Sequence, residues 1–198
     1  HVIAPAYSKQ YGTFTEMHDG VPMTVHRIRS HRVLVHKTLR FVIPFTLKKR
    51  VDLILDGFEP DAIHSQSHMV LGRVLVRSGR ERGIRMIATN HIMPENFLKY
   101  LHLPRFLEKR VMKGLWRDSG KILSKYDHVT TPTKRAAELL QEAAGISNVL
   151  SISCGIDAGK FANPTKTTNK PFRVLFLGRL DWEKHIHNLL RAMAKLPK

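Results

Sequence analysis

Three residues near the end of the chain, in the stretch VLFLGRLDWEKH at 174–185, have the types and spacing of an anion-binding site. The apolar run predicts a buried strand, and the residues after it predict a helix. In open α/β sheets, ligands bind where strands end and helix N-termini offer free N–H groups. Gly178 would let the backbone approach a phosphate closely, while Arg179 would offer a bidentate fork and Lys184 a point charge. The pattern is typical of a diphosphate site, although two ordinary surface cations would have the same spacing.

The elements that must position such a site alternate along the chain. Short apolar runs are separated by longer helical stretches, which predicts an α/β protein with a mainly parallel sheet. A polar stretch rich in Pro, Thr and Asn then predicts a linker. We therefore divide the chain into a domain at 1–160, a linker at 161–171 and the start of a second domain at 172–198. The expected strands are 1–6, 23–30, 61–67, 84–91, 128–133, 149–157 and 172–178, and the expected helices are 68–83, 133–145 and 182–196.

Local signals mark where two of these helices begin and end. Thr133 is the expected N-cap of the helix at 133–145, and Gly145 its expected C′ residue. Gly83 is expected to stop the helix at 68–83.

Composition restricts the class of protein. The formal net charge is +17, from 33 Lys and Arg against 16 Asp and Glu. Such an excess attracts polyanions, which include nucleic acid, anionic lipid surfaces and phosphorylated ligands. A single cysteine, Cys154, excludes an internal disulfide and fits a reducing compartment. No apolar run reaches the roughly 18 residues that span a membrane. The chain begins HVIAPA without an initiator Met, so we expect a chain cut in mid-fold.

Two segments hold much of the positive charge. Residues 27–50 contain Lys and Arg but neither Asp nor Glu. In 105–125 a basic residue recurs at every fourth position, and each such step drifts about 40° around a helix, so that three or four of these charges share a face. A solvated helix face would have this pattern, and so would an amphipathic surface that meets anionic lipid headgroups. The candidates for membrane contact are Arg105, Lys109, Lys113 and Arg117.

Four stretches, in order along nearly the whole chain, resemble segments of one protein family. The stretch at 174–196 closely resembles the GRL-x-x-EKG corner that opens the second domain of retaining glycosyltransferases of family 4. The stretches at 61–96, 128–140 and 153–161 resemble, in turn, the part of the first domain that lines the cleft, the strand and helix before the linker, and an NGVD-type turn. The resemblance implies a GT-B fold. The chain would hold a Rossmann-like N-terminal domain whose first strand is missing, and the start of a second Rossmann-like domain.

The resemblance also implies roles for particular residues. Arg179 and Lys184 would hold the donor's diphosphate and stabilise the leaving nucleotide. His91, at the end of the expected strand 84–91, would face the sugar as a catalytic residue, although packing or capping explains most histidines. His64 would lie at a strand end near the cleft. Glu95 and Asn96 would lie in the cleft on the acceptor side, although capping of a helix explains them equally well.

No metal or cofactor is expected. His64 and His68 lie four positions apart, as a metal pair could, but no third ligand is evident. The family's enzymes of this kind work without a metal, and the nucleotide sugar is their co-substrate.

The implied reaction moves a hexose from a UDP- or GDP-sugar to an acceptor hydroxyl with retention of configuration. The sequences at 63–73 and 89–96 most resemble the bacterial branch of the family that acts on lipids such as diacylglycerol or phosphatidylinositol, and the basic segments fit that branch. We therefore expect a cytoplasmic protein bound peripherally to the inner face of the membrane. A soluble small-molecule acceptor is compatible with the same core. A basic nucleic-acid-binding module is the remaining alternative, but no helix-turn-helix, zinc finger or RNA-binding motif is present.

Three departures from the family pattern predict an inactive fragment. The first strand and its glycine-rich loop would precede His1. The paired-glutamate motif of the second domain would lie beyond Lys198. His185 stands where the family has glycine.

Overall fold

The computed structural model describes residues 1–32, 40–95, 98, 103–162, 173–180 and 184–196. Its contacts divide the chain into two units, His1–Cys154 and Gly155–Lys198. Each unit is described by itself. Asn96, one of the predicted site residues, lies outside the described residues.

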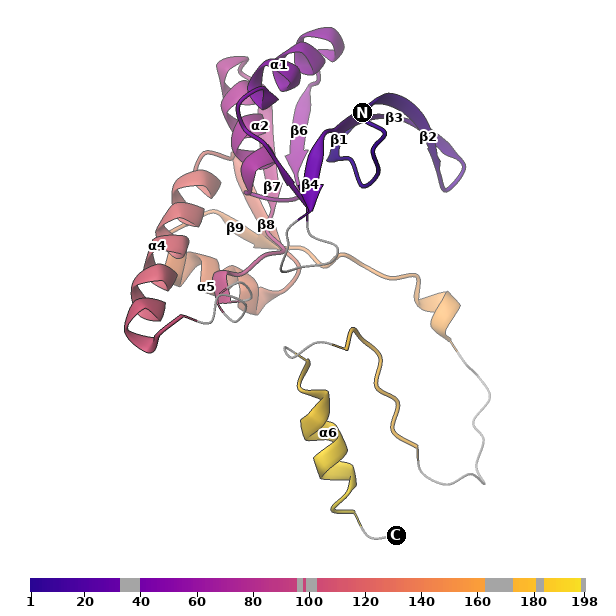
Figure 1. Ribbon diagram of the computed structural model, residues 1–198, viewed down its shortest axis with the longest axis vertical. Coiled ribbons are helices and arrows are strands. Elements are labelled where there is room, and N and C mark those ends of the chain that lie inside the picture. The colour runs from indigo at the N-terminus through magenta and orange to yellow at the C-terminus, as the bar shows by residue number, and fades with distance from the viewer. Residues whose placement is uncertain (33–39, 96–97, 99–102, 163–172, 181–183, 197–198) are drawn as a thin grey trace. The chain divides into compact units, whose positions relative to one another are not determined.

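The first unit is built around a four-stranded parallel sheet (Figure 1). Its order is β6-β7-β8-β9, and each neighbouring pair is parallel. The connections from strand to strand contain the helices α2, α4 and α5, which confirms the predicted α/β class. The bounds are β6 Ala62–Ser65, α2 Val70–Glu81, β7 Arg85–Thr89, α4 Arg105–Leu123, β8 His128–Thr131, α5 Lys134–Ala144 and β9 Val149–Ser151.

The predicted helix ends are also confirmed. The Thr133 side chain accepts a hydrogen bond from the Ala136 N–H at 3.2 Å and so caps α5. Gly145 follows α5 with φ 68°, and Gly83 follows α2 with φ 67°. Both lie in the left-handed region that glycine adopts without a steric cost.

A second, mixed sheet precedes the parallel one. Its order is β1-β3-β2, with β1 (Val2–Pro5) parallel and β2 (Gly12–His18) antiparallel to β3 (Val21–Ile28). The β2–β3 hairpin turns at Asp19 and Gly20, which have φ 47° and 80°. Asp-Gly is the sequence that favours such a turn. A short pair, β4 (Ser30–Arg32) and β5 (Arg40–Val42), is antiparallel.

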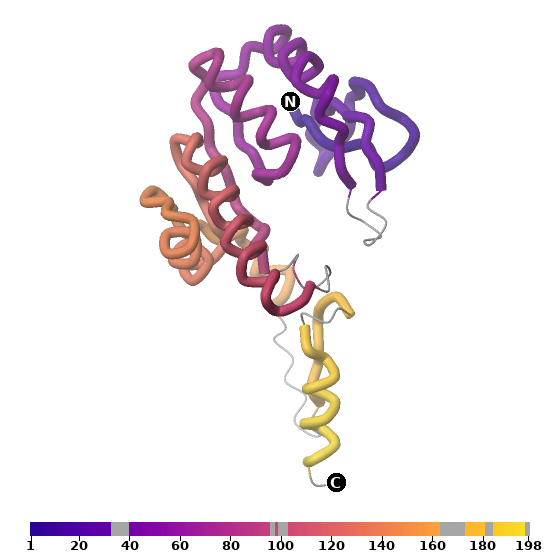
Figure 2. The backbone as a smooth tube through the Cα atoms, turned by 60° about the vertical axis from the view of Figure 1, so that its left-hand side comes forward, coloured from indigo at the N-terminus to yellow at the C-terminus, as the bar shows by residue number. Residues whose placement is uncertain are grey.

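Helix α1 (Leu47–Phe58) follows and lies beside α2 in both backbone views (Figures 1 and 2). It buries Leu47, Val51 and Leu55, which are spaced four apart on one face. These side chains join one core cluster with Ile63, Met86, Leu123, Val129 and Leu140 from the sheet and the other helices. The basic residues of the predicted segment 27–50 that fall in α1 therefore belong to an amphipathic helix whose apolar face is buried.

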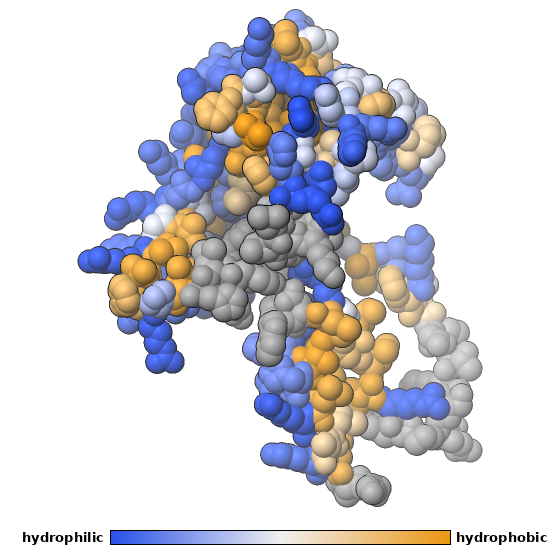
Figure 3. All heavy atoms as spheres, in the orientation of Figure 1, coloured by the Kyte–Doolittle hydropathy of each residue, from blue (hydrophilic) through white to orange (hydrophobic). Residues whose placement is uncertain are grey.

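The second unit differs from its prediction. The structure gives residues 173–180 no strand, so the expected strand at 172–178 is wrong for the described residues 173–178. A strand needs a neighbour to receive its N–H and C=O groups, and within the described part of this unit no segment is a strand. Leu175 and Leu177 are 86% and 89% exposed, and Figure 3 shows hydrophobic atoms over this part of the chain.

The predicted helix at 182–196 is present as the shorter α6 (Ile186–Met193), and a 3₁₀ turn, η1, covers Ala158–Phe161.

Candidate active site

Polar side chains meet at the carboxyl ends of three neighbouring strands. Thr89 ends β7 and is paired in register with Thr130 of β8, while His64 lies near the end of β6. The Thr89 hydroxyl oxygen lies 2.7 Å from His64 Nε2 and 2.8 Å from the Thr130 hydroxyl oxygen. Because the three strands are parallel, these side chains share one edge of the sheet, where α/β proteins bind ligands.

Gln66 joins the two predicted histidines of this edge. Its Oε1 accepts a hydrogen bond from His91 Nε2 at 2.9 Å, and its Nε2 lies 3.2 Å from His64 Nε2. Gln66, His64 and His91 are all exposed. The structure therefore brings His64 and His91 together through an intervening amide, in a chain of contacts that continues to Thr89 and Thr130. We call these five residues the strand-edge network.

The strand-edge network consists of imidazole, amide and hydroxyl groups. Such groups both donate and accept hydrogen bonds, as binding of sugar hydroxyls requires. None of its five members is a carboxylate, so the network itself contains no group that could form a glycosyl–enzyme ester. Its exposed histidines have ring nitrogens that can bind a hydroxyl group.

Sequence reasoning found two of the five members and missed Gln66, Thr89 and Thr130. The available signal was the polar character of the residues that end three consecutive predicted parallel strands, in IHSQ, IATNH and HVTT. What the sequence did not supply was the register that places Thr89 opposite Thr130.

His64 and His68 have separate partners. His68 is buried, with Nδ1 3.1 Å from Asn90 Oδ1 and Nε2 3.2 Å from the Ser119 hydroxyl. His64 is exposed and contacts Thr89. Within the described ranges, no group of three or more His, Cys, Asp or Glu residues is placed to hold a metal ion.

Glu95 contacts α4 instead of the strand-edge network. Its Oε1 accepts a hydrogen bond from Trp116 Nε1 at 3.0 Å. Its Oε2 is buried and has no hydrogen-bond partner among the residues that the structure describes. The Trp116 bond joins the segment after β7 to α4.

The residues predicted to bind the diphosphate all lie in the second unit. Gly178 and Arg179 belong to the segment 173–180, which has no regular secondary structure, and Lys184 lies two residues before α6. Gly178 does not have a positive φ, so its backbone conformation does not itself require glycine. His185, which stands where the resemblance predicts glycine, has φ 48° and ψ 38° and therefore adopts the left-handed conformation that glycine prefers.

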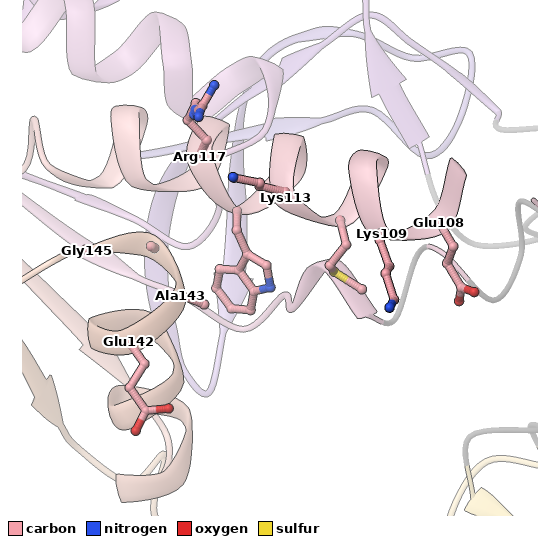
Figure 4. Close-up of a pocket in the computed structure, with 10 residues that line it drawn as sticks. Glu108, Lys109, Lys113, Arg117, Glu142, Ala143 and Gly145 are labelled. Atoms are coloured by element: carbon pink, nitrogen blue, oxygen red, sulfur yellow. The ribbon is translucent and has the colours of Figure 1, made fainter. Parts of the chain in front are cut away.

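A groove lies between α4 and α5 in the first unit (Figure 4). Its volume is about 730 Å³, and its walls include Trp116 and Met112 from α4 and Glu142 from α5. Three of the four predicted membrane-contact residues, Lys109, Lys113 and Arg117, line it. The fourth, Arg105, starts α4 beside Phe106, whose side chain is 74% exposed. All four cations are exposed, so α4 presents a basic surface with an apolar residue at its first turn.

Comparison with known proteins decides the family. The family model described as Glycosyltransferase Family 4 matches residues 1–160. The chain belongs to this family. The predicted resemblance is thereby confirmed. The parallel sheet of the first unit, with its helices, has the Rossmann-like arrangement that the family implies for an N-terminal domain.

Curated relatives agree with this assignment. A GDP-mannose-dependent alpha-mannosyltransferase of Mycobacterium tuberculosis (strain CDC 1551 / Oshkosh) is 27% identical over 95% of this chain and 49% of its own length. A protein of the same name from Mycolicibacterium smegmatis (strain ATCC 700084 / mc(2)155) is 26% identical over 98% of this chain and 51% of its own length. An alpha-monoglucosyldiacylglycerol synthase of Streptococcus pneumoniae (strain ATCC BAA-255 / R6) is 28% identical over 73% of this chain and 35% of its own length. The chain thus spans about half the length of the first two relatives.

Proposed function

We propose that the protein to which this chain belongs transfers a hexose from a UDP- or GDP-sugar to an acceptor hydroxyl with retention of configuration. The observation that carries the proposal is the strand-edge network, in which His91 and His64 are exposed and held by Gln66 in a chain of this family. The names of two relatives specify a GDP-mannose donor, which is one of the two kinds of donor proposed here.

The proposed roles of the individual residues follow from the chemistry of their side chains. His91 and His64 bind hydroxyls of the sugar or the acceptor and orient the reacting face. Arg179 and Lys184 bind the diphosphate and stabilise the negative charge that grows on it as the nucleotide leaves. Electrostatic stabilisation of a leaving group by one well-placed donor is worth about 3 kcal/mol, or roughly a hundredfold in rate. We propose no metal and no cofactor besides the nucleotide sugar.

Transfer assays with two histidine variants test the role of the strand-edge network. His91→Ala removes an imidazole at the carboxyl edge of the sheet. His128→Ala is the matched control, because His128 is an exposed histidine that starts β8 and so lies at the opposite edge. Both are made in the native protein and assayed with GDP-mannose and UDP-glucose. We expect His91→Ala to lose about a hundredfold in kcat/KM, as for loss of one preorganised donor, and His128→Ala to keep its activity. Equal activity of the two variants would contradict the assignment.

We further propose a membrane lipid as the acceptor and an anionic membrane surface as the partner of α4. The name of the third relative specifies a monoglucosyldiacylglycerol product. The support from this chain is the exposed row of Arg105, Lys109, Lys113 and Arg117 with Phe106 at its end. Among the described residues, no helix is long and apolar enough to cross a bilayer. We propose peripheral contact at the inner face, through the charge of this row and a shallow apolar anchor.

Sedimentation with vesicles tests this contact. The double variant Lys109→Glu with Lys113→Glu reverses two charges on α4. The control, Lys134→Glu with Arg135→Glu, reverses two exposed charges at the start of α5. Each cation near an anionic surface contributes about 1 kcal/mol. We therefore expect the α4 variant to bind phosphatidylglycerol vesicles at least tenfold more weakly, and the control to bind like the parent. Equal binding to anionic and neutral vesicles would overturn the proposed anionic contact, and so would equal weakening of both variants. Absence of binding to either kind of vesicle would favour a soluble acceptor.

A further inference from the structure

Three buried polar residues form a hydrogen-bonded connection beneath the strand-edge network. His68 is 6% exposed, Asn90 2% and Ser119 4%. They come from the turn before α2, the residue after β7 and the second half of α4, so the connection joins three elements of the first unit. Buried polar groups need hydrogen-bond partners, and here the three side chains supply them to one another.

The backbone carbonyl of Ile92 determines which ring nitrogen of His68 carries a hydrogen. The Asn90 amide nitrogen donates to the Ile92 carbonyl oxygen at 3.0 Å, and a carbonyl can only accept. This orients the Asn90 amide so that Oδ1, an acceptor, faces His68 Nδ1 at 3.1 Å. His68 Nδ1 must therefore carry a hydrogen. In the neutral ring Nε2 is then an acceptor, and the Ser119 hydroxyl donates to it across 3.2 Å.

Asn90 in turn fixes the backbone on both sides of His91. Its main-chain N–H donates to the Thr130 carbonyl at 2.8 Å, which ties the end of β7 to β8. Its side chain binds the carbonyl of Ile92, the residue after His91. The backbone of His91 is thus held between two hydrogen bonds of one residue, whose remaining side-chain atom, Oδ1, is held by His68.

We propose that His68 is a positioning residue for His91. It holds the Asn90 amide in the orientation that fixes the His91 turn, and thereby keeps His91 Nε2 within reach of Gln66. The effect on transfer rests on the proposed function of His91, whereas the effect on the geometry of the turn does not.

The surroundings of His68 favour its neutral form. Burial lowers the pKa of His68, and the hydrogen bond to Asn90 opposes this only in part. The charged groups that face it are Arg73 of α2 and Asp118 of α4, which form an ion pair with each other. With the ring neutral, the Nδ1–H tautomer remains the form that serves both Asn90 and Ser119.

Two amide substitutions separate the two halves of the connection. The amide nitrogen of Asn reaches the place of histidine Nδ1, so His68→Asn can still donate to Asn90. The amide of the longer Gln reaches the place of Nε2, so His68→Gln keeps the contact with Ser119 and loses the short donor to Asn90. Ser119→Ala removes the other half of the connection and leaves the bond between His68 and Asn90. If His68 acts through Asn90, the variants that keep this bond retain the His91 turn and His68→Gln does not.

Nitrogen-15 NMR of the histidine rings is the deciding measurement, because it reads the 198-residue chain without any transfer reaction. In the parent chain at pH 7.5 we expect the shifts of a neutral His68 ring protonated at Nδ1. The backbone amide of Asn90, which donates to the Thr130 carbonyl at 2.8 Å, should exchange with solvent about tenfold faster in His68→Gln, as expected when the Asn90 side chain is no longer held. In His68→Asn and Ser119→Ala it should exchange within about twofold of the parent rate.

A ring protonated at Nε2, or equal exchange in His68→Gln and His68→Asn, would overturn the proposal. In transfer assays of the native protein we expect kcat to fall about tenfold in His68→Gln and to be retained in His68→Asn. If NMR shows the expected pattern and transfer is absent from the parent as well, the proposed function fails while the positioning role stands. If transfer is present and the two His68 variants share one rate, the positioning role fails alone.

Discussion

Replacement of Gly72 by alanine should damage the fold beneath the strand-edge network. Gly72 lies in the first turn of α2 and is buried against the turn after β6. A Cβ at this position would overlap the carbonyl oxygen of Ser67 and lie 2.9 Å from its carbonyl carbon and 3.0 Å from Ser65 Oγ. Carbon atoms in contact keep about 3.5 Å or more, so the backbone at Ser67 must move by at least about half an ångström.

The magnitude follows from two opposing effects. Alanine is about 1 kcal/mol better than glycine inside a helix, whereas overpacking against fixed backbone costs up to about 3 kcal/mol. We expect Gly72→Ala to lower the free energy of unfolding by about 2 kcal/mol. Gly114→Ala is the matched control, because Gly114 is an exposed glycine inside α4 with no atom within 4 Å of an added Cβ. It should raise the free energy of unfolding by about 1 kcal/mol.

Urea unfolding followed by circular dichroism measures both variants. The predicted difference of about 3 kcal/mol between two identical substitutions is far larger than the uncertainty of the extrapolation. Because Gln66 lies between Ser65 and Ser67, the movement should also weaken its contact with His91, visible as a change in the His91 ring shifts. If Gly72→Ala is as stable as Gly114→Ala, the close approach of α2 to the Ser67 carbonyl is not present in solution.

Three further predictions concern pH, a buried bond and a helix end. Burial lowers the pKa of both His68 and His26 in the folded chain, so the unfolded chain, with histidine pKa values near ~6.5, binds protons first. The contribution of these two histidines to the free energy of unfolding is therefore complete above about pH 6.5 and is lost as the pH falls below it. The urea midpoint should drop between pH 7.5 and 5.5, and a rise would contradict the burial of the two rings. Trp116→Phe leaves Glu95 Oε1 without its donor and should cost about 1–2 kcal/mol, whereas Glu95→Gln keeps an acceptor and should cost less; equal costs in urea unfolding would refute the bond. Gly83→Ala meets no atom within 4 Å at φ 67°, so it should cost about 1 kcal/mol from backbone strain alone, with Gly83→Asn losing less in the same assay.

The parallel sheet and its helices were predictable because each element carries its own local signals. Apolar runs of four or five residues are followed by helices whose ends are marked by Gly83, Thr133 and Gly145, and these signals need no knowledge of the rest of the fold. Elements with weaker or competing signals, among them β2 and α1, are not predicted. Strand β2 is mostly exposed and has little apolar content, so only Asp19-Gly20 indicates its hairpin. Helix α1 lies in a segment that stands out for its basic residues, although Leu47, Val51 and Leu55 share one face.

The candidate site was predictable only in part, for a physical reason. Strand ends can be located from sequence, and this led to His64 and His91. The partners of these histidines depend on the register between strands and on the course of the turns, which no local pattern fixes. His68 illustrates the limit. Its spacing from His64 is compatible with a metal pair, but His64 lies in β6 and is exposed, whereas His68 lies after the strand and is buried.

The two groups of proposed functional residues depend on different interactions. The strand-edge network is held by backbone ladders between β6, β7 and β8, so its geometry follows from strands that are already paired. The diphosphate assignment to Arg179 and Lys184 depends on a strand-to-helix corner, and a corner directs its N–H groups at one point only when the strand before it is paired. In the described second unit the segment before Arg179 has no ladder, and Leu175 and Leu177 are almost fully exposed. Binding of a nucleotide diphosphate by Arg179 and Lys184 should therefore require conditions in which residues 173–177 are hydrogen-bonded as a strand, and slow amide exchange at Leu175 and Leu177 should accompany that binding.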